Sequence, residues 1–230
     1  MKHPISAATF VAACLTSQAA LAQDDGQVAR ATSPIDLSAS AAVGSDYVWR
    51  GLTQTGGKPA AFVSVTAAHD GFYAGAGTEN VDFGGISQEY DLWGGYMFTA
   101  GDSTIDLGLS FYGYVDSPQD IDTLEAKLAV TRTRGKLTYS TAAYYTANYF
   151  GTGKGALYLE ANGAWQLSDK LSGSAAAGIQ NISSLDDYVT WNAGLTYQLG
   201  KRVKLDLRYH DTHGYTEDSA RGAALLTYAF

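Results

Sequence analysis

Apolar and polar residues alternate with a period of two along most of the chain, and clusters of Gly, Asp, Asn, Ser and Pro interrupt the alternation. Successive side chains of a β-strand point to opposite faces, so the pattern predicts strands with one apolar and one polar face. Few windows show apolar residues at helical spacing. The predicted strands cover residues 37–49, 60–69, 72–80, 88–98, 104–115, 123–132, 137–149, 156–167, 171–182, 188–199, 203–210 and 220–230.

Charged side chains on the polar faces favour a membrane barrel over a soluble barrel. The eleventh segment alternates apolar and charged residues: Val203, Lys204, Leu205, Asp206, Leu207, Arg208. A small soluble barrel would bury the apolar set inside, whereas a barrel with lipid outside and water inside explains the charge on the other face. The segments also approach the roughly 9–11 residues of a tilted membrane strand. We therefore predict an all-β fold, a transmembrane antiparallel up-and-down β-barrel of twelve strands over residues 36–230.

Aromatic residues on the apolar phase gather at the two ends of the predicted strands. At one end lie Tyr47, Trp49, Tyr90, Phe111, Tyr145 and Tyr149. At the other end lie Phe72, Tyr96, Phe98, Tyr139, Trp165, Tyr197 and Tyr228. Such rings are typical of the two membrane interfaces, where amphipathic aromatic side chains are stable.

The connections alternate between long and short. The odd-numbered ones are longer, namely residues 50–59, 81–87, 116–122, 150–155, 183–187 and 211–219, and the even-numbered ones are 70–71, 99–103, 133–136, 168–170 and 200–202. Outer-membrane barrels have long extracellular loops and short periplasmic turns. This rhythm requires an even number of strands, with both termini on the periplasmic side.

The N-terminus has the pattern of an export signal. Residues 1–22 contain a short polar start with Lys2, an apolar stretch and an Ala20-Leu21-Ala22 cleavage site. Residues 23–35 are polar and are predicted to be a flexible periplasmic segment. An alternative is a lipoprotein signal ending at Cys14. Because Cys14 is the single cysteine, a mature chain from residue 23 would hold neither a disulfide nor a thiolate metal site.

Net charge excludes one class of partner. The formal charge is −8, and removal of Lys2 with the signal leaves 14 basic against 23 acidic residues, hence −9. Nucleic-acid binding requires a basic face, so we expect none. We also find no motif for a cofactor, a metal or a catalytic nucleophile, and we expect no enzyme activity.

Residues 45–55, with the sequence SDYVWRGLTQT, carry a resemblance to a known family. Together with residues 58–60, 71–75, 80–83, 89–92 and 95–96 they resemble the TorF porin family of Gram-negative outer-membrane β-barrels. The resemblance implies an outer-membrane location and a pore-forming role, without a substrate. The last strand, with Leu226, Tyr228 and Phe230 on one face, resembles the C-terminal signature recognised by the barrel-assembly machinery.

The polar phase supplies the candidate functional residues. The predicted pore lining comprises Asp46, Arg50, Glu79, Glu89, Asp91, Asp106, Glu125, Lys127, Glu160, Lys204, Asp206, Arg208 and Arg221. One interpretation is a charged pore that selects solutes, with a cation bias from eight acids against five bases; the other is a structural ladder of ion pairs filling a narrow barrel. Aromatic residues of the same phase either stack on solutes or fill space: Trp93, Tyr112, Tyr114, Tyr144, Tyr158 and Tyr188.

The leading hypothesis is passive diffusion of small hydrophilic solutes through an outer-membrane channel. A second is a phospholipase-like barrel hydrolase, which needs a Ser and a His together on the lipid-facing side; His210 and His213 are its support. A third is a closed structural or adhesive barrel whose lumen charges are paired. The sequence leaves open the solute, the oligomeric state and the loop that narrows the pore.

Overall fold

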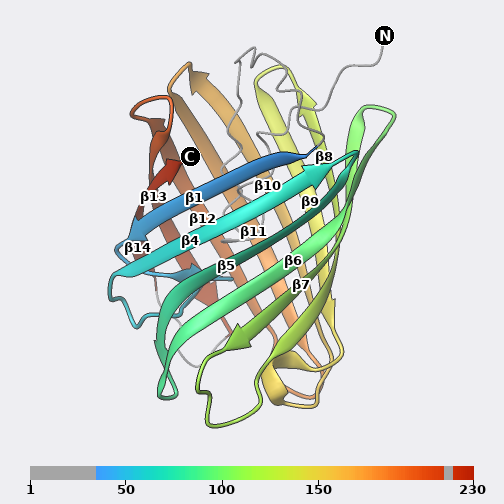
Figure 1. Cartoon of the computed structure of the whole chain (residues 1–230), viewed down its shortest axis with the longest axis vertical. Helices are drawn as coiled ribbons and strands as arrows, with labels where there is room; N and C mark the ends of the chain where they lie inside the picture. Colours follow the sequence, from blue (N-terminus) through green and yellow to red (C-terminus); the bar gives the residue numbers. More distant parts are fainter. Residues whose placement is uncertain (1–34, 215–219) are drawn as a thin grey trace.

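The computed structural model describes residues 35–214 and 220–230, and within them twelve antiparallel strands close into a barrel (Figure 1). Going around the wall, β1 is followed by β4 to β14 in chain order, and β14 pairs with β1 to close the barrel. The wall strands are β1 Asp36–Gly44, β4 Ala60–His69, β5 Phe72–Phe83, β6 Ile86–Ala100, β7 Ser103–Tyr114, β8 Thr123–Arg134, β9 Leu137–Thr146, β10 Ala156–Ser168, β11 Leu171–Ile182, β12 Tyr188–Gln198, β13 Val203–His213 and β14 Arg221–Ala229. The predicted fold and strand number are confirmed.

Several strand boundaries differ from the sequence prediction. β1 ends at Gly44 rather than at residue 49, and β9 ends at Thr146 rather than at residue 149. β13 continues to His213. β5 and β6 extend until only Gly84 and Gly85 separate them, so the expected long loop at 81–87 is a two-residue turn. Both glycines have positive φ, 58° and 82°, which suits a tight hairpin turn.

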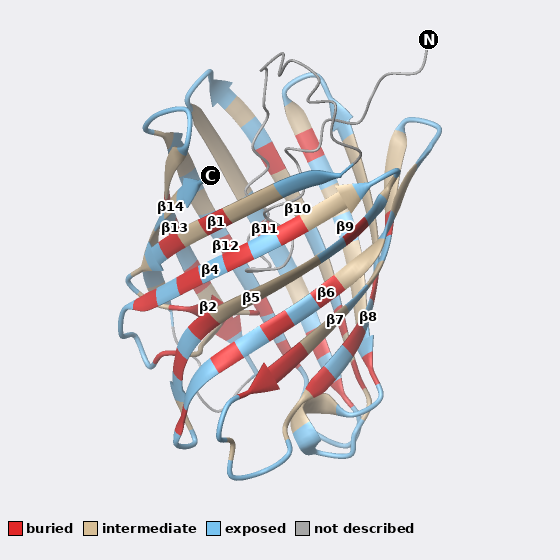
Figure 2. Ribbon diagram, in the orientation of Figure 1, coloured by how far each residue is buried: buried red, intermediate tan, exposed pale blue. Residues whose placement is uncertain are grey.

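Exposure alternates along the wall as the sequence pattern predicts. On β4 the burial of successive residues alternates strictly from Ala60 to Thr66, and Figure 2 shows the same banding on neighbouring strands. The exposed face is apolar, with Val63, Leu107, Leu128 and Leu207 about half exposed. The buried face is polar and charged. A barrel that is apolar outside and charged inside inverts the arrangement of a soluble protein.

The aromatic ring at the turn side is confirmed as outward-facing. Its members are exposed or partly exposed: Phe72, Tyr96, Phe98, Tyr139, Trp165, Tyr197 and Tyr228. At the loop side Tyr90, Phe111 and Tyr145 face outward, joined by Trp191 and Tyr209. Three predicted members are wrong. Tyr47 and Trp49 leave the wall with the segment after Gly44, and Tyr149 begins a short 3₁₀ turn, Tyr149–Gly151.

Glycines in the wall make room for large aromatic side chains inside the barrel. Trp93 on β6 is paired in register with Gly75 on β5. A Cβ at Gly75 would lie 2.4 Å from the Trp93 ring, so no other residue fits there without moving it. The Trp93 ring therefore explains why a glycine, Gly75, stands in the middle of β5.

The long and short connections lie at opposite ends of the barrel, as the sequence indicates. Residues 45–59, 115–122, 147–155 and 183–187 connect strands at one end, and turns such as Asp70–Gly71 connect them at the other. Among the described residues no helix is long and apolar enough to cross a membrane. The predicted signal peptide, most of residues 23–35 and Cys14 lie outside the described residues.

Candidate functional site: the lumen and its inner loop

Residues 45–59, here called the inner loop, turn from the wall into the barrel. They contain a small hairpin of two strands, β2 Val48–Trp49 and β3 Leu52–Thr53. Its two-residue turn, Arg50-Gly51, has positive φ at both positions, 45° and 81°. That geometry is typical of a type I′ hairpin turn, in which a non-glycine residue is under strain. Arg50 is therefore held in its position by the surrounding contacts.

Arg50 forms a two-pronged ion pair with Glu125 on β8. Its Nη1 and Nη2 atoms lie 2.9 and 2.7 Å from the two carboxylate oxygens of Glu125. Nη1 also donates to Oε1 of Gln180 on β11 at 3.1 Å. The Arg50 and Glu125 side chains are only 3% and 2% exposed. Parallel N–H···O bonds of this kind are among the strongest polar contacts in proteins.

Aromatic rings surround the same guanidinium group. The Arg50 Cζ atom lies 4.2 Å from the ring centroid of Trp49, 4.4 Å from that of Tyr158 and 5.1 Å from that of Tyr144. Burial alone opposes the charge, but the adjacent Glu125 carboxylate raises the pKa of Arg50 above its ordinary value. The Arg50 side chain is therefore a fixed positive charge in the lumen at any physiological pH.

Gly51 anchors the tip of the hairpin to a further strand. Its carbonyl oxygen accepts a hydrogen bond from Thr212 Oγ1 on β13 at 3.1 Å. A Cβ at Gly51 would lie 2.2 Å from that hydroxyl oxygen and 2.3 Å from Thr190 Oγ1 on β12. The order of strands places β8 and β11 on either side of the wall opposite β1. The inner loop thus crosses the lumen from β1 to the far wall.

The base of the inner loop is fixed by Asp46. Its Oδ1 atom accepts hydrogen bonds from the Thr53 and Thr55 hydroxyls at 2.5 and 2.8 Å. The Nη1 atom of Arg221, on β14, lies 3.6 Å from Asp46 Oδ2. Tyr47 packs edge-on against Phe62 of β4, with ring centroids 5.2 Å apart. The loop is therefore held at both its base and its tip.

Two further ion pairs lie on the inner wall. Lys127 Nζ is 2.6 Å from Asp106 Oδ2, and the Tyr73 hydroxyl donates to the other Asp106 oxygen at 2.7 Å. Arg208 Nη2 is 3.0 Å from Asp206 Oδ2. The same guanidinium donates to Asn192 Oδ1 at 2.7 Å and to Ser174 Oγ at 2.9 Å. The Asp106–Lys127 pair links β7 with β8. The Arg208 contacts link β13 with β12 and β11.

The thirteen residues predicted from the sequence all lie on the inner face or the inner loop, and they form two groups. Four bases, Arg50, Lys127, Arg208 and Arg221, are paired with Glu125, Asp106, Asp206 and Asp46. In the described part of the chain no ion pair joins the remaining five, Glu79, Glu89, Asp91, Glu160 and Lys204. Glu160 instead accepts a hydrogen bond from the Tyr158 hydroxyl at 3.0 Å. The excess negative charge of the lumen is therefore carried by the four acids outside these ion pairs, Glu79, Glu89, Asp91 and Glu160.

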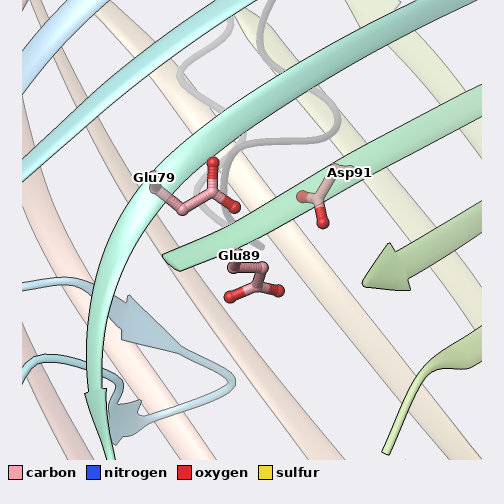
Figure 3. Close-up of side chains that lie close together, drawn as sticks. All are labelled: Glu79, Glu89 and Asp91. Carbon is pink, nitrogen blue, oxygen red and sulfur yellow. The ribbon is translucent and has the colours of Figure 1, made fainter. Parts of the chain in front are cut away.

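Three of these acids form a cluster, here called the acidic triad: Glu79 on β5 and Glu89 and Asp91 on β6. One carboxylate oxygen from each lies within 4.8 Å of the other two, and Figure 3 shows the three side chains near one another on adjacent strands. Glu79 and Glu89 are paired in register, so the strand pairing itself brings them together. All three residues are buried, with 2 to 4% exposure.

A cavity of about 340 Å³ lies at the loop end, between the inner loop and the wall. We call it the outer vestibule. Its lining is mainly aromatic, with Glu89 and Arg221 as charged members: Tyr47, Trp49, Phe83, Glu89, Tyr114, Tyr149, Phe150 and Arg221. The Tyr114 hydroxyl donates to Glu89 Oε1 at 3.2 Å. Glu89 is therefore both a member of the acidic triad and part of the vestibule wall.

The aromatic residues predicted on the polar faces point into the lumen, where they pack against other side chains. Trp93, Tyr112, Tyr114, Tyr158 and Tyr188 are buried, and Tyr144 is partly buried. Tyr144 and Tyr158 surround Arg50, and the Tyr112 hydroxyl donates to Glu125 Oε2 at 3.2 Å. This arrangement favours the space-filling interpretation over solute stacking.

His210 faces the lumen and is 2% exposed, so it does not meet the lipid-facing requirement of the hydrolase alternative. His213 is exposed at the end of β13, where Nε2 lies 3.3 Å from Asp211 Oδ2. The two histidines are three residues apart on one strand and therefore point to opposite faces.

Sequence reasoning missed the inner loop as a unit, together with its wall contacts Gln180 and Thr212. The alternation of residues 37–49 continues through the point where the chain leaves the wall. Two signals were available: the turn residues Gly44-Ser45-Asp46 inside the predicted strand 37–49, and Arg50-Gly51 directly after it.

The fold of the barrel is similar to that of solved outer-membrane porins and channels. The NanC porin matches with a TM-score of 0.58 and 7% identity, covering 85% of this chain and 99% of that chain. An outer-membrane channel from Pseudomonas putida F1 matches with a TM-score of 0.50 and 8% identity, covering 90% and 99%. A porin refined at 1.8 Å has a TM-score of 0.44 and 16% identity over 74% of this chain and 62% of that chain, so this chain spans about three fifths of that barrel. No curated protein matches the sequence.

The likeness to the TorF porins remains a resemblance, because the family model that matches does not carry that name. It describes a bacterial protein of unknown function (Gcw_chp), and it matches residues 28–228. The matched range begins before β1 and ends within the last strand, β14. With its closed porin-like barrel, the chain belongs to the Gcw_chp family of bacterial proteins of unknown function.

Proposed function

We propose that the protein is a porin-like channel of a Gram-negative outer membrane, through which small hydrophilic solutes diffuse and in which the inner loop forms the constriction. The observation that carries the proposal is a closed barrel with an apolar outer face and a charged inner face. Lipid outside and water inside stabilise that distribution, and no other common environment does.

The orientation in the membrane follows from the connections. The inner loop and the other long connections would face the cell exterior, and the tight turns, with both termini, would face the periplasm. The last strand ends with Tyr228 and Phe230 on the outer face, 39% and 70% exposed. These side chains would be available to the barrel-assembly machinery while the barrel closes.

Selectivity would arise where the inner loop meets the wall. A solute entering from outside reaches the outer vestibule, bounded by Glu89 and Arg221, and must then pass the Arg50–Glu125 pair. Paired charges largely cancel at a distance, so the acids outside ion pairs, Glu79, Glu89, Asp91 and Glu160, set the sign of the local field. We therefore propose a bias toward cations and neutral solutes.

A second candidate is a closed structural barrel, and one observation favours it. The inner loop spans the lumen and is held by buried contacts at its tip and its base, so the resting barrel could be impermeable. The two candidates differ in what happens when the tip of the loop is released.

Conductance of the refolded barrel in planar bilayers tests the proposal. We expect small discrete steps with a cation-biased reversal potential for the wild type, and larger steps for Arg50→Ala, which frees the loop tip. Arg134→Ala, at an exposed position at the end of β8, is the matched control and should behave as wild type. Silence of both the wild type and Arg50→Ala, in barrels shown to be folded by heat-modifiable migration, would establish the closed barrel. Equal steps in both would show that the inner loop is not the constriction.

A further inference from the structure

The acidic triad is a group of neighbouring lumen acids with which, among the described residues, no base is paired. The four lumen ion pairs named above use Asp46, Asp106, Glu125 and Asp206. The triad instead brings three carboxylates together, with one oxygen of each within 4.8 Å of the others. At such separations mutual repulsion is large wherever the surroundings are shielded from water.

A second observation concerns the individual oxygen atoms. Both carboxylate oxygens of Glu79 are buried and accept no hydrogen bond from a hydroxyl, amide or basic group of the described residues, and Glu79 itself is 3% exposed. The Asp91 carboxyl group lies within hydrogen-bonding reach of Glu79. Glu89 Oε2 and Asp91 Oδ1 are also buried and also lack such a hydrogen bond. Buried acceptors are normally paired, so several such atoms directed at one point favour a bound cation there. Figure 3 shows the Glu79 carboxylate directed toward Glu89 and Asp91.

The chemistry of the donors identifies the ligand. They are all carboxylate oxygens, the donor type preferred by hard divalent cations. Ca²⁺ binds oxygen at about 2.3–2.6 Å, so two oxygens on one ion lie at most about 5 Å apart. The three triad oxygens lie within 4.8 Å of one another, inside that span, so one Ca²⁺ can contact all three. Mg²⁺ demands near-ideal octahedral geometry and gives up its water reluctantly, so it is less suited to such a cluster. Three carboxylates leave several coordination positions for water.

We infer that Glu79, Glu89 and Asp91 form a divalent-cation site on the inner wall of the barrel, with Ca²⁺ as its ligand. Glu89 lines the outer vestibule, which gives the ion a path from the exterior. Bound Ca²⁺ joins β5 to β6 and compensates the acid excess of this wall. The inference does not depend on conduction, since a closed barrel would hold the same site.

Ion binding to the refolded full-length barrel tests the site. Ca²⁺ is titrated by calorimetry, and Tb³⁺ luminescence serves as a second probe because Tyr114, hydrogen-bonded to Glu89, can sensitise it. We expect one tight Ca²⁺ per barrel, a higher unfolding temperature in Ca²⁺ than in chelator, and loss of affinity by at least tenfold in Glu79→Gln and in Asp91→Asn.

Two controls isolate the triad. Glu160→Gln removes another lumen carboxylate, one that has a hydroxyl partner, and should keep the site. Asp120→Asn removes an exposed loop acid and should also keep it. Absence of Ca²⁺ binding by the wild type up to about 10 mM, above the ~0.1–1 mM range of weak extracellular sites, would overturn the inference, because protons would then neutralise the cluster. Equal binding by Glu79→Gln and Asp91→Asn would place the ion elsewhere and would overturn it too. The titration of the wild-type barrel still shows whether Ca²⁺ binds, even if one variant fails to fold.

Discussion

At the scale of single residues, the lumen is organised by Arg50. The residue lies at a positive φ of 45°, which an arginine adopts only under constraint, and its side chain meets Glu125, Gln180 and the rings of Trp49 and Tyr158. A buried ion pair adds little net stability compared with a well-packed apolar substitute, but the loss of one partner leaves an uncompensated charge. Arg50 therefore fixes the path of the loop more than it adds to the stability of the barrel.

A double-mutant cycle measures this coupling. Arg50→Met should destabilise the folded barrel by about 3–5 kcal/mol, because Glu125 is left buried and charged. The double variant Arg50→Met/Glu125→Gln should recover much of that loss. Urea unfolding from lipid vesicles, followed by tryptophan fluorescence, gives the free energies.

The exposed pair Arg132–Asp102 provides the control for that cycle. The Asp102 side chain is 75% exposed, and the corresponding coupling should be about 0–1 kcal/mol. If the Arg50 and Glu125 substitutions were simply additive, the pair would not be coupled and the inner loop would be held by other contacts.

At the scale of elements, the wall and the inner loop differ in how far the sequence predicts them. The bounds of β4 and β11 coincide with the predicted 60–69 and 171–182, because alternation is a local property and a tight turn delimits one end of each strand. The first strand was predicted five residues too long. Its alternation continues into the inner loop, where the same period places Tyr47 and Trp49 against inner surfaces instead of lipid.

Gly51 tests how closely the inner loop fits the lumen. Gly51→Ala adds a Cβ at 2.2 Å from Thr212 Oγ1 and should displace the hairpin tip, so that trypsin cleaves after Arg50 in folded barrels. Gly56→Ala is the matched control: its φ is also positive, 63°, but no atom lies within 4 Å of the added Cβ. Mass spectrometry of the fragments reads out the cleavage. Equal protection of Arg50 in both variants would contradict the close fit.

At the scale of the whole molecule, the distribution of polarity is the main determinant of behaviour. Apolar side chains cover the outside of the wall, and aromatic residues gather toward its two ends. The charged residues are inside, and most of them belong either to the four ion pairs or to the acidic triad. A barrel of this kind is stable only if its outer belt is removed from water.

Matched arginine substitutions on β8 test the membrane belt. Leu128 lies at the middle of the strand and Leu124 near its loop end, and the two are similarly exposed at 47% and 55%. Leu128→Arg should reduce the free energy of folding into vesicles by about 2–4 kcal/mol, and Leu124→Arg by about 0–1 kcal/mol. Equal costs at the two depths would argue for a barrel that does not span a bilayer.

The sequence by itself determined the number of strands, the two faces of each strand and the set of residues that turn inward. These features depend on a period of two and on turn residues, both of which are local. Even the meeting of Glu79 with Glu89 follows from the pairing of neighbouring strands, although the sequence analysis did not single it out.

Only the tertiary structure decided how the inward-facing charges are used. Arg50 contacts Glu125 and Gln180, which lie 75 and 130 residues further along the chain, and Gly51 contacts Thr212. Which inward-facing charges become neighbours depends on closure of the barrel and on the path of the inner loop across it. A loop enters the lumen only when the enclosed space offers both room and a counter-charge, and neither exists until all twelve strands are in place.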